Sequence, residues 1–306
     1  MPRNPSSAAR LALAPAAMLL ALAACDLTDS AGPQEPLPAD QSPGTFRLTL
    51  DHDGIQREAV VFVPETYDAQ ARTPLVLNFH GFGGIAAEHM EWADLRTQAA
   101  ETGALLVYPQ GSDLDGAPHW NPAPAGGDNK SSADDLGFIE VLLDEIAASY
   151  PYDARRVSAV GYSNGGMMAM GLACLRSDLV ASAGSVSGAM LDGDCAPGHP
   201  VSVITVHGTE DPTIPYEGGE GYPSAEETVE HWVEVTGAGD AQSTTLRDGG
   251  TTIAYQAHEG GTNGAAVHHY RVDGGDHVWF DFEADGRTAN DRIWDFLTAY
   301  STDGRL

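Results

Sequence analysis

The sequence predicts an α/β fold in which a mainly parallel sheet carries helices on both faces. Three observations support this. Short apolar runs without polar alternation, such as residues 74–79 and 201–206, are typical of strands buried on both sides. Segments with helical periodicity alternate with these runs along the chain. Glycine-rich and polar residues directly follow several runs, at the sheet edge where ligands bind in such folds.

The individual elements follow in an order that fits this fold. Two strands flank Asp53-Gly54, a strong hairpin signal. A helix over 86–102 is expected to end at Gly103, and a long polar loop to cover 111–132. Ser224-x-x-Glu227 is a capping box for a helix that ends at Gly237. The expected strands are 46–50, 57–63, 74–79, 104–108, 156–160, 201–206, 253–258 and 267–272, and the other expected helices are 133–149, a segment after Ser163, and 288–300.

The first 44 of the 306 residues are not expected to belong to the fold. Arg3 and Arg10 precede an apolar run over 11–24, which is typical of a secretory signal and shorter than the ~20 residues of a membrane span. The run ends in Leu22-Ala23-Ala24-Cys25, which resembles a bacterial lipobox, in which cleavage leaves a lipidated cysteine. A plain cleavage site followed by a chance cysteine is the alternative.

Residues 26–44 contain four prolines and little apolar bulk, as in a solvated tether. We therefore expect a lipoprotein-type signal peptide over 1–24, a lipid-anchor cysteine and tether over 25–44, and one α/β domain over 45–306. The protein would be exported and held at the cell surface or the periplasmic membrane face through Cys25, or released from there.

The charge balance argues against nucleic acid as a partner. The chain has 44 acidic and 15 basic residues, a formal net charge of −29, and a single lysine, Lys130. Such a chain repels nucleic acid and anionic surfaces, and its excess acid suits solubility. No metal-ligand spacing and no nucleotide-binding loop is found, so no cofactor or metal is expected.

Two of the three cysteines form a candidate disulfide. If Cys25 carries lipid, Cys174 and Cys195 remain as a pair in an exported chain, where oxidation is expected. Such a bridge would stabilise the fold by roughly 3 kcal/mol through restriction of the unfolded chain. Two buried thiols are the alternative.

GYSNGG, residues 161–166, places a glycine two positions away on each side of Ser163. The strand expected over 156–160 leads into it and helix-like sequence follows. This is the context of a nucleophile elbow, a sharp strand-to-helix turn that exposes a serine hydroxyl. A glycine-rich loop whose serine caps a helix is the alternative, and the flanking elements favour the nucleophile.

A nucleophilic serine needs a histidine base and an acid that orients the base, which in this architecture follow it in the order acid, then histidine. Asp211 directly follows the strand over 201–206. His277 lies in a glycine-rich loop after the strand over 267–272. The rival acids are Glu210, which neighbours Asp211, and Asp192 and Asp194, which follow no clear strand. The rival bases are His268 and His269, which lie inside a strand, and His80 and His207, which precede Asp211.

A further element is a candidate oxyanion hole. His80-Gly81-Phe82-Gly83-Gly84 follows the strand over 74–79, and its glycines leave backbone N–H groups free to point at one spot. The N–H groups of Phe82 and Asn164 are expected to bind the developing negative charge on a substrate oxygen. One such donor contributes roughly 3 to 4 kcal/mol.

Together these stretches resemble the exported poly(3-hydroxybutyrate) depolymerase and feruloyl esterase group of α/β-hydrolases, which includes acetylxylan-esterase-like members. The resemblance implies an α/β-hydrolase fold, a secreted esterase, and Ser163, Asp211 and His277 as the catalytic triad. It covers most of residues 75–280. The matching stretches are HGFGG, Trp120-Asn121 followed by DDLGF (134–138), RRVSAVGYSNGGMM, the Cys174/Cys195 pair, VHGTED and GGDHVWF.

The sequence departs from that group near the expected substrate. Many members have adjacent cysteines in the loop before Asp134, where this chain reads PAPAGGDNK, and Trp-Pro-Gly where this chain has Val278-Trp279-Phe280. Trp120 and Trp279 are candidates for stacking on an acyl group, with buried core tryptophans as the alternative. Ser132-x-x-Asp135 resembles a helix cap, which we favour over a catalytic role for Asp134 and Asp135.

The constellation predicts a serine esterase that acts through an acyl-enzyme. The ester would be of the polyhydroxybutyrate type, or a feruloyl or acetyl ester of polysaccharide, and the sequence does not choose among them. A serine peptidase or amidase of the same fold, and a non-catalytic surface binding protein on a hydrolase scaffold, are the alternatives.

Overall fold

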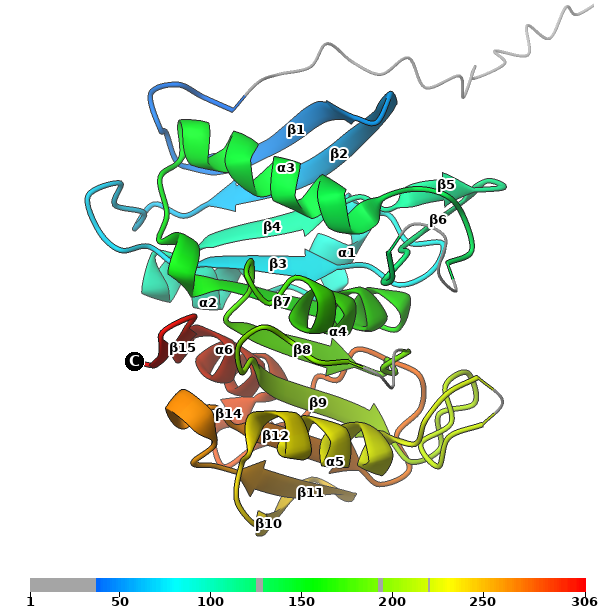
Figure 1. Cartoon of the computed structure of the whole chain (residues 1–306). Coiled ribbons are helices and arrows are strands. Elements are labelled where there is room, and N and C mark those ends of the chain that lie inside the picture. The colour runs from blue at the N-terminus through cyan, green and yellow to red at the C-terminus, as the bar shows by residue number, and fades with distance from the viewer. Residues whose placement is uncertain (1–36, 125–128, 192–194, 220) are drawn as a thin grey trace, which may run out of the picture. The chain divides into compact units, whose positions relative to one another are not determined.

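A ten-stranded sheet organises the described part of the chain, which in this computed structural model comprises residues 37–124, 129–191, 195–219 and 221–306 (Figure 1). The strand order is β1-β2-β4-β3-β7-β8-β9-β12-β11-β10. The run from β4 to β12 is parallel, and antiparallel strands close both edges. The strands of the sheet are β1 (Gly44–His52), β2 (Ile55–Val63), β3 (Leu75–Phe79), β4 (Leu105–Pro109), β7 (Val157–Tyr162), β8 (Ser182–Val186), β9 (Ser202–Gly208), β10 (Gln242–Asp248), β11 (Thr251–His258) and β12 (Val267–Val272).

Helices cover both faces of this sheet. In Figure 1, α3, α4 and α5 lie in front of it, and α1, α2 and α6 lie behind it. The helices are α1 (Ala86–Trp92), α2 (Arg96–Thr102), α3 (Asp135–Ser149), α4 (Asn164–Leu175), α5 (Ala225–Thr236) and α6 (Ala289–Thr298). The predicted mainly parallel sheet with helices on both faces is therefore confirmed.

Side chains of the sheet strands point alternately to the two faces, so a hydrophobic core forms on each face. On β3, Leu75, Leu77 and Phe79 pack into the cluster that contains α3, α4 and α5, whereas Val76 packs into the cluster of the opposite face. All of these side chains are fully buried. A strand that is buried on both sides therefore carries apolar residues at nearly every position, which is what the continuous apolar runs indicated.

Helix ends follow the expected chemistry in several places. Ser224 and Glu227 form the predicted capping box of α5, and Thr288 and Asp291 form another at α6. The expected helix over 86–102 is wrong in one respect, because it divides into α1 and α2. The carbonyl of Ala93 accepts hydrogen bonds from the buried Asn78 side chain and the Tyr108 hydroxyl, which ends the first helix there.

The segment expected as a polar loop over 111–132 is more ordered than predicted. It contains a short hairpin of β5 (Ser112–Leu114) and β6 (Ala117–His119), and His119, Trp120 and Asn121 are buried. Two strands of the main sheet escaped prediction. β8 is built from small residues, and β10 is an exposed edge strand without apolar alternation. The remaining short pairs are β13 (Glu283–Ala284) with β14 (Arg287–Thr288) and β15 (Tyr300–Ser301) with β16 (Gly304–Arg305).

Several expectations concern residues outside the described ranges. They are the signal peptide over 1–24, the lipid-anchor Cys25, most of the tether, and the rival acids Asp192 and Asp194. Within the described ranges, no helix combines the length and the apolar character that crossing a membrane requires.

Candidate active site

Ser163 occupies a strained turn between β7 and the start of α4. Its backbone has φ 53° and ψ −120°, a conformation that costs a non-glycine residue free energy and occurs at functional turns. The flanking glycines permit the turn, because a Cβ at Gly161 would lie 2.3 Å from the Gly165 carbonyl carbon, and one at Gly165 would lie 2.1 Å from the Phe79 oxygen. The sequence therefore forms the predicted elbow.

The structure brings the three predicted triad residues into one hydrogen-bonded chain. His277 Nε2 lies 3.0 Å from Ser163 Oγ, and His277 Nδ1 lies 2.7 Å from Asp211 Oδ2. Ser163 follows β7, Asp211 follows β9 and His277 follows β12, so parallel strands deliver all three to one edge of the sheet. This geometry lets the imidazole accept a proton from the serine while the carboxylate fixes its tautomer.

Asp211 is surrounded by donors. Its Oδ1 accepts the N–H groups of Thr213 (2.8 Å) and Ile214 (2.9 Å), while its Oδ2 faces His277. His207 adds a further contact, with Nε2 at 2.8 Å from the Ile214 oxygen and 3.3 Å from Asp211 Oδ2. Burial lowers the pKa of His207, so its ring is neutral at neutral pH and Nε2–H donates. These donors orient a fully buried carboxylate and stabilise its charge.

The loop that carries His277 is held from two sides. The Tyr162 hydroxyl donates to the His277 carbonyl oxygen (2.7 Å), and Ser187 Oγ donates to the Val278 carbonyl oxygen (2.8 Å). Burial and the charges of Asp211 and Asp276 raise the pKa of Tyr162 to about 12, so it remains a donor. Sequence reasoning missed these supports, although Tyr162 lies inside GYSNGG and could have been suspected.

The candidate oxyanion loop lies against the elbow. A Cβ at Gly81 would be 3.4 Å from Ser163 Cβ, so the HGFGG segment passes directly beside the serine. Among the described residues, no hydrogen bond uses the N–H of Phe82 or Asn164. Both groups are therefore available to a ligand oxygen, as an oxyanion hole requires.

His80 sets the direction of the Phe82 N–H. The Gly111 N–H donates to His80 Nε2 (2.9 Å), so Nδ1 carries the proton and donates to the Gly81 oxygen (2.7 Å). Burial lowers the pKa of His80 to about 4, which keeps the ring neutral. In a trans peptide the C=O and the following N–H point in opposite directions, so fixing the Gly81 carbonyl fixes the Phe82 N–H. His80 is thus a support of the loop rather than a base.

Asn164 and Trp120 join the elbow to the segment after β6. The Asn164 side chain accepts from the Trp120 N–H (2.7 Å) and donates to the Trp120 carbonyl oxygen (3.1 Å). Trp120 Nε1 donates to the His80 carbonyl oxygen (3.0 Å). Trp120 borders the cleft but is 1% exposed, so the core interpretation holds and no open ring face is left for stacking.

The expected stacking role of Trp279 is wrong. Its ring is buried in the core behind the sheet, next to α6, and Nε1 donates to Asn290 Oδ1 (2.9 Å). It does not line the cleft that contains Ser163. The indole ring contacts the His89 ring of α1 edge-on, with ring centres 5.9 Å apart.

The helix cap expected from Ser132-x-x-Asp135 is present at the start of α3, but Asp134 rather than Ser132 forms it. Asp134 is the N-cap of α3, and its Oδ1 accepts the Gly137 N–H (3.0 Å). Asp135 is instead buried, with Oδ1 2.6 Å from Arg57 Nη2 and Oδ2 accepting the Asn121 N–H (2.7 Å). Burial raises the pKa of the Asp135 carboxyl, and the Arg57 guanidinium opposes that shift. The Arg57–Asp135 pair therefore holds Asn121, the residue next to Trp120. No local sequence pattern indicated this role.

The other rival residues have structural contacts. Glu210 is exposed, and its N–H donates to the Gly275 oxygen. His269 is buried between the Thr205 and Tyr216 hydroxyls, and burial lowers its pKa to about 3. His268 contacts Glu259. None of the three touches Ser163 or His277.

Comparison with known proteins agrees with this geometry. Residues 54–214, just over half of the chain, match the family model described as "Putative esterase". The chain belongs to this esterase family.

Two curated relatives and one solved structure illustrate the similarity. "Putative esterase NocK" of Nocardia uniformis subsp. tsuyamanensis is 30% identical over 67% of this chain and 65% of its own. "Feruloyl esterase B" of Piromyces equi is 26% identical over 80% of this chain and 45% of its own. This chain thus spans less than two thirds of either protein. The acetyl xylan esterase of Aspergillus awamori has a TM-score of 0.58 at 14% identity, covering 82% of this chain and 98% of that one, and confirms the α/β-hydrolase fold.

A cleft of about 550 Å³ adjoins Ser163 in this esterase family member. Phe82, which is half exposed, stands at its rim, and Lys130 Nζ lies 4.7 Å from the centre of the Phe82 ring. The sequence singled out Lys130 only as the single lysine. The remaining described residues of the wall are Trp120, Pro122, Asn129, Asn164, Met167, Leu191, Thr213, Ile214, Gly221 and Tyr222.

The predicted disulfide is present in the structure. Cys174 at the end of α4 is bonded to Cys195, with their Cα atoms 5.3 Å apart. The bond ties α4 to the chain just beyond Leu191, a residue of the cleft wall. The disulfide therefore supports one side of the cleft.

Proposed function

We propose that this chain is an exported serine esterase that cleaves carboxylic esters through an acyl-enzyme. The observation that carries the proposal is the hydrogen-bonded chain Asp211–His277–Ser163, with distances of 2.7 and 3.0 Å, beside the N–H groups of Phe82 and Asn164, which no described residue engages. Membership of the esterase family supports the same reaction class.

The mechanism follows from the contacts. His277 Nε2 accepts the Ser163 hydroxyl proton as Oγ attacks the ester carbonyl carbon. The two N–H groups bind the resulting oxyanion, and Asp211 stabilises the imidazolium through Nδ1–H. His277 then returns the proton to the departing alcohol. Water, deprotonated by His277, attacks the acyl-enzyme and releases the carboxylic acid and free Ser163.

Substitution of Ser163 tests this mechanism. Ser163→Ala is expected to abolish hydrolysis of a p-nitrophenyl acyl ester, while Ser243→Ala, on the exposed edge strand β10, keeps the parent rate. Full activity in Ser163→Ala would overturn the proposed mechanism.

The proposed substrates are the three kinds of ester that the sequence suggested. The similarity to proteins named feruloyl and acetyl xylan esterases supports feruloyl or acetyl esters of polysaccharide, and the earlier resemblance also includes polyhydroxybutyrate-type polyesters. A release assay should compare methyl ferulate, acetylated xylan and hydroxybutyrate oligomers. Activity on at least one is expected, and activity on none would refute this substrate class.

The proposal includes export and anchoring through Cys25. Its support is the signal-like run over 11–24, the lipobox-like Leu22-Ala23-Ala24-Cys25 and the proline-rich tether. In a bacterial host, the full chain is expected in the membrane fraction, and Cys25→Ser in the soluble fraction or retained as precursor. An unchanged membrane fraction for Cys25→Ser would refute the lipid anchor.

A further inference from the structure

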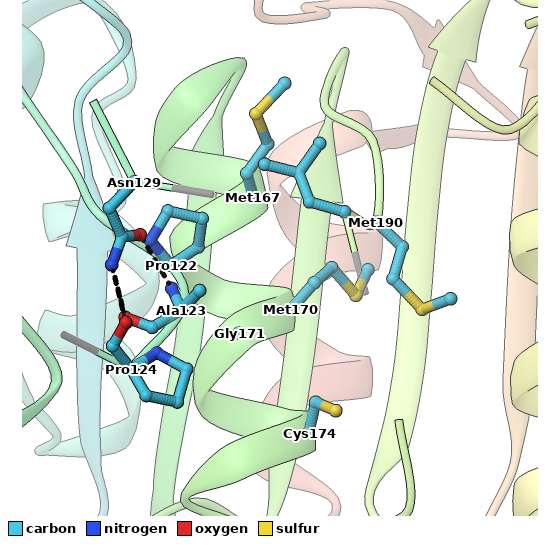
Figure 2. Close-up of a pocket in the computed structure, with 10 residues that line it drawn as sticks. Pro122, Ala123, Pro124, Asn129, Met167, Met170, Gly171, Cys174 and Met190 are labelled. Carbon is cyan, nitrogen blue, oxygen red and sulfur yellow. Dashed lines mark hydrogen bonds between the residues drawn. The ribbon is translucent and has the colours of Figure 1, made fainter. Parts of the chain in front are cut away.

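The two donors of the candidate oxyanion hole are held in different ways. The Asn164 N–H belongs to the first residue of α4, a helix that is fixed along its length. Figure 2 shows Gly171 of this helix beside Pro122, and a Cβ at Gly171 would lie 2.3 Å from the Pro122 oxygen, so helix and neighbouring segment touch through backbone. The Phe82 N–H instead lies in the loop between β3 and α1, so its direction depends on contacts made by other residues.

The Phe82 N–H takes its direction from the Gly81 carbonyl group, which accepts two hydrogen bonds. One comes from His80 Nδ1 (2.7 Å), and the other from the Gly84 N–H (3.0 Å), which closes a turn around Phe82. The Gly81 C=O and the Phe82 N–H belong to one planar peptide unit, so these two donors fix the N–H as well. Whatever holds His80 and Gly84 therefore holds the oxyanion donor.

The side chain of Gln110 contacts both of these residues. Its Nε2 donates to the Gly84 oxygen (3.2 Å) and lies 3.0 Å from His80 Nε2, while its Oε1 accepts the Ala86 N–H (2.8 Å). A side-chain amide has two donor hydrogens and one acceptor oxygen, and here each faces the kind of partner that it requires. The three contacts together grip the loop from residue 80 to residue 86.

The contact with His80 also determines which ring nitrogen carries the proton. His80 Nε2 faces two donors, the Gln110 amide and the Gly111 N–H (2.9 Å), so it acts as an acceptor. Nδ1 then carries the proton that it donates to the Gly81 oxygen. The His80 ring is fully buried, so partners inside the protein decide its tautomer.

The backbone of Gln110 is itself fixed by the sheet. The residue directly follows β4, which runs parallel to β3 and so ends beside His80. Its N–H donates to the Glu58 oxygen on β2 (2.8 Å), and its carbonyl oxygen accepts from Arg57 Nη2 (3.2 Å). A side chain on such a fixed backbone can position a neighbouring loop precisely.

We propose that Gln110 is a positioning residue of the oxyanion hole: it holds His80 and Gly84 so that the Phe82 N–H points at the substrate oxygen. The proposal rests on the serine esterase function proposed above. Gln110 is not among the described residues that line the cleft of Ser163, so its loss should change turnover rather than substrate binding.

The test is Gln110→Glu in the full-length enzyme, a change that keeps the size of the side chain. One carboxylate oxygen can still accept the Ala86 N–H, but the other then faces the Gly84 oxygen and His80 Nε2, where a donor is needed. We expect kcat on p-nitrophenyl acetate to fall about 10- to 100-fold with little change in KM, since complete loss of one donor costs about 10²- to 10³-fold. Gln256→Glu, half-buried on β11, is the matched control and should keep the parent kcat.

A trifluoromethyl ketone separates the oxyanion hole from general damage to the fold. Ser163 Oγ adds to the ketone carbonyl carbon, its proton passes to His277, and the oxyanion that forms binds the same two N–H groups. In Gln110→Glu the Ki of this inhibitor should rise by the factor by which kcat/KM falls, as expected for a transition-state analogue. A variant that merely contains less folded enzyme would keep the parent Ki.

The outcomes distinguish this role from the esterase function. An unchanged kcat, a loss confined to KM, or a lower kcat with the parent Ki would overturn the positioning role. If Gln110→Glu does not fold, Gln110→Met, which keeps the length and removes the amide, is judged by the same criteria. Nitrogen-15 NMR of the parent adds a measurement without any variant: His80 should carry its proton on Nδ1, and a proton on Nε2 would also overturn the proposal. A parent that hydrolyses no ester would instead refute the esterase function.

Discussion

The Ser163–His277–Asp211 cluster and the wall segment (residues 111–124 and 129–132) both border the cleft, but they are held in different ways. Each member of the cluster follows a parallel strand, so the sheet places all three, and the Tyr162 and Ser187 hydroxyls hold the His277 loop in addition. The wall segment depends on a few side chains reaching across from other elements: Asn164 to Trp120, Asp135 to Asn121, and His80 to Gly111.

The difference shows how this fold separates chemistry from selectivity. Strand ends place reacting groups with little freedom, so a hydrolytic centre can persist while the sequence around it changes. The wall segment can be altered through single side-chain contacts without disturbing the sheet. We expect substitutions in the cluster to abolish turnover, and substitutions that release the wall segment to act through stability and substrate binding.

The largest effect is expected at Asp211. In Asp211→Asn, Oδ1 can still accept the Thr213 and Ile214 N–H groups, but the amide NH₂ then faces His277 Nδ1 and imposes the wrong tautomer. Loss of the carboxylate at such a position lowers kcat by about 10⁴-fold. Steady-state kinetics on a p-nitrophenyl ester measures this. Glu210→Gln, the neighbouring rival acid, is the control and should keep the parent kcat; the reverse pattern would make Glu210 the acid.

The next effect concerns the anchor of the wall segment. Asp135→Ala leaves the Arg57 guanidinium buried without its partner and frees the Asn121 N–H, which is expected to cost about 3 to 5 kcal/mol of unfolding free energy. Asp134→Ala removes the cap of α3, worth about 1 kcal/mol, and a partly exposed contact with His52. Urea denaturation of both variants gives the comparison. Equal losses would mean that Asp135 is no more than a second capping residue.

A smaller effect is expected at His207, which supports the cluster from within. Removing its contact with Asp211 in His207→Gln should lower kcat about tenfold with little change in KM, because a hydrogen bond to a charged group contributes about 1.5 to 3 kcal/mol. His258→Gln, on β11 next to the edge strand, is the matched control. The kcat and KM of the parent and of both variants are to be measured over a range of pH. If the kcat of His207→Gln equals that of the parent at every pH, the Thr213 and Ile214 N–H groups suffice to hold Asp211.

The sequence predicted the cluster better than its surroundings for a physical reason. A strand, a glycine-rich turn and a helix are local patterns, and parallel strands bring their ends together whatever lies between them, so GYSNGG, HGTED and GGDH could be read directly. The buried pair of Arg57 and Asp135 joins residues 78 apart, and no local pattern reveals such a contact. Trp279 was misplaced because the sequence does not show which face of the sheet a loop residue reaches.

The most direct test of the central claim, that His277 and Asp211 activate Ser163 as the nucleophile, is to locate the adduct of a fluorophosphonate by mass spectrometry. We expect one phosphonyl group per protein, on the peptide that contains Ser163, with labelling absent in Ser163→Ala and strongly slowed in His277→Ala. A label on another residue, or equal labelling of the parent and Ser163→Ala, would contradict it.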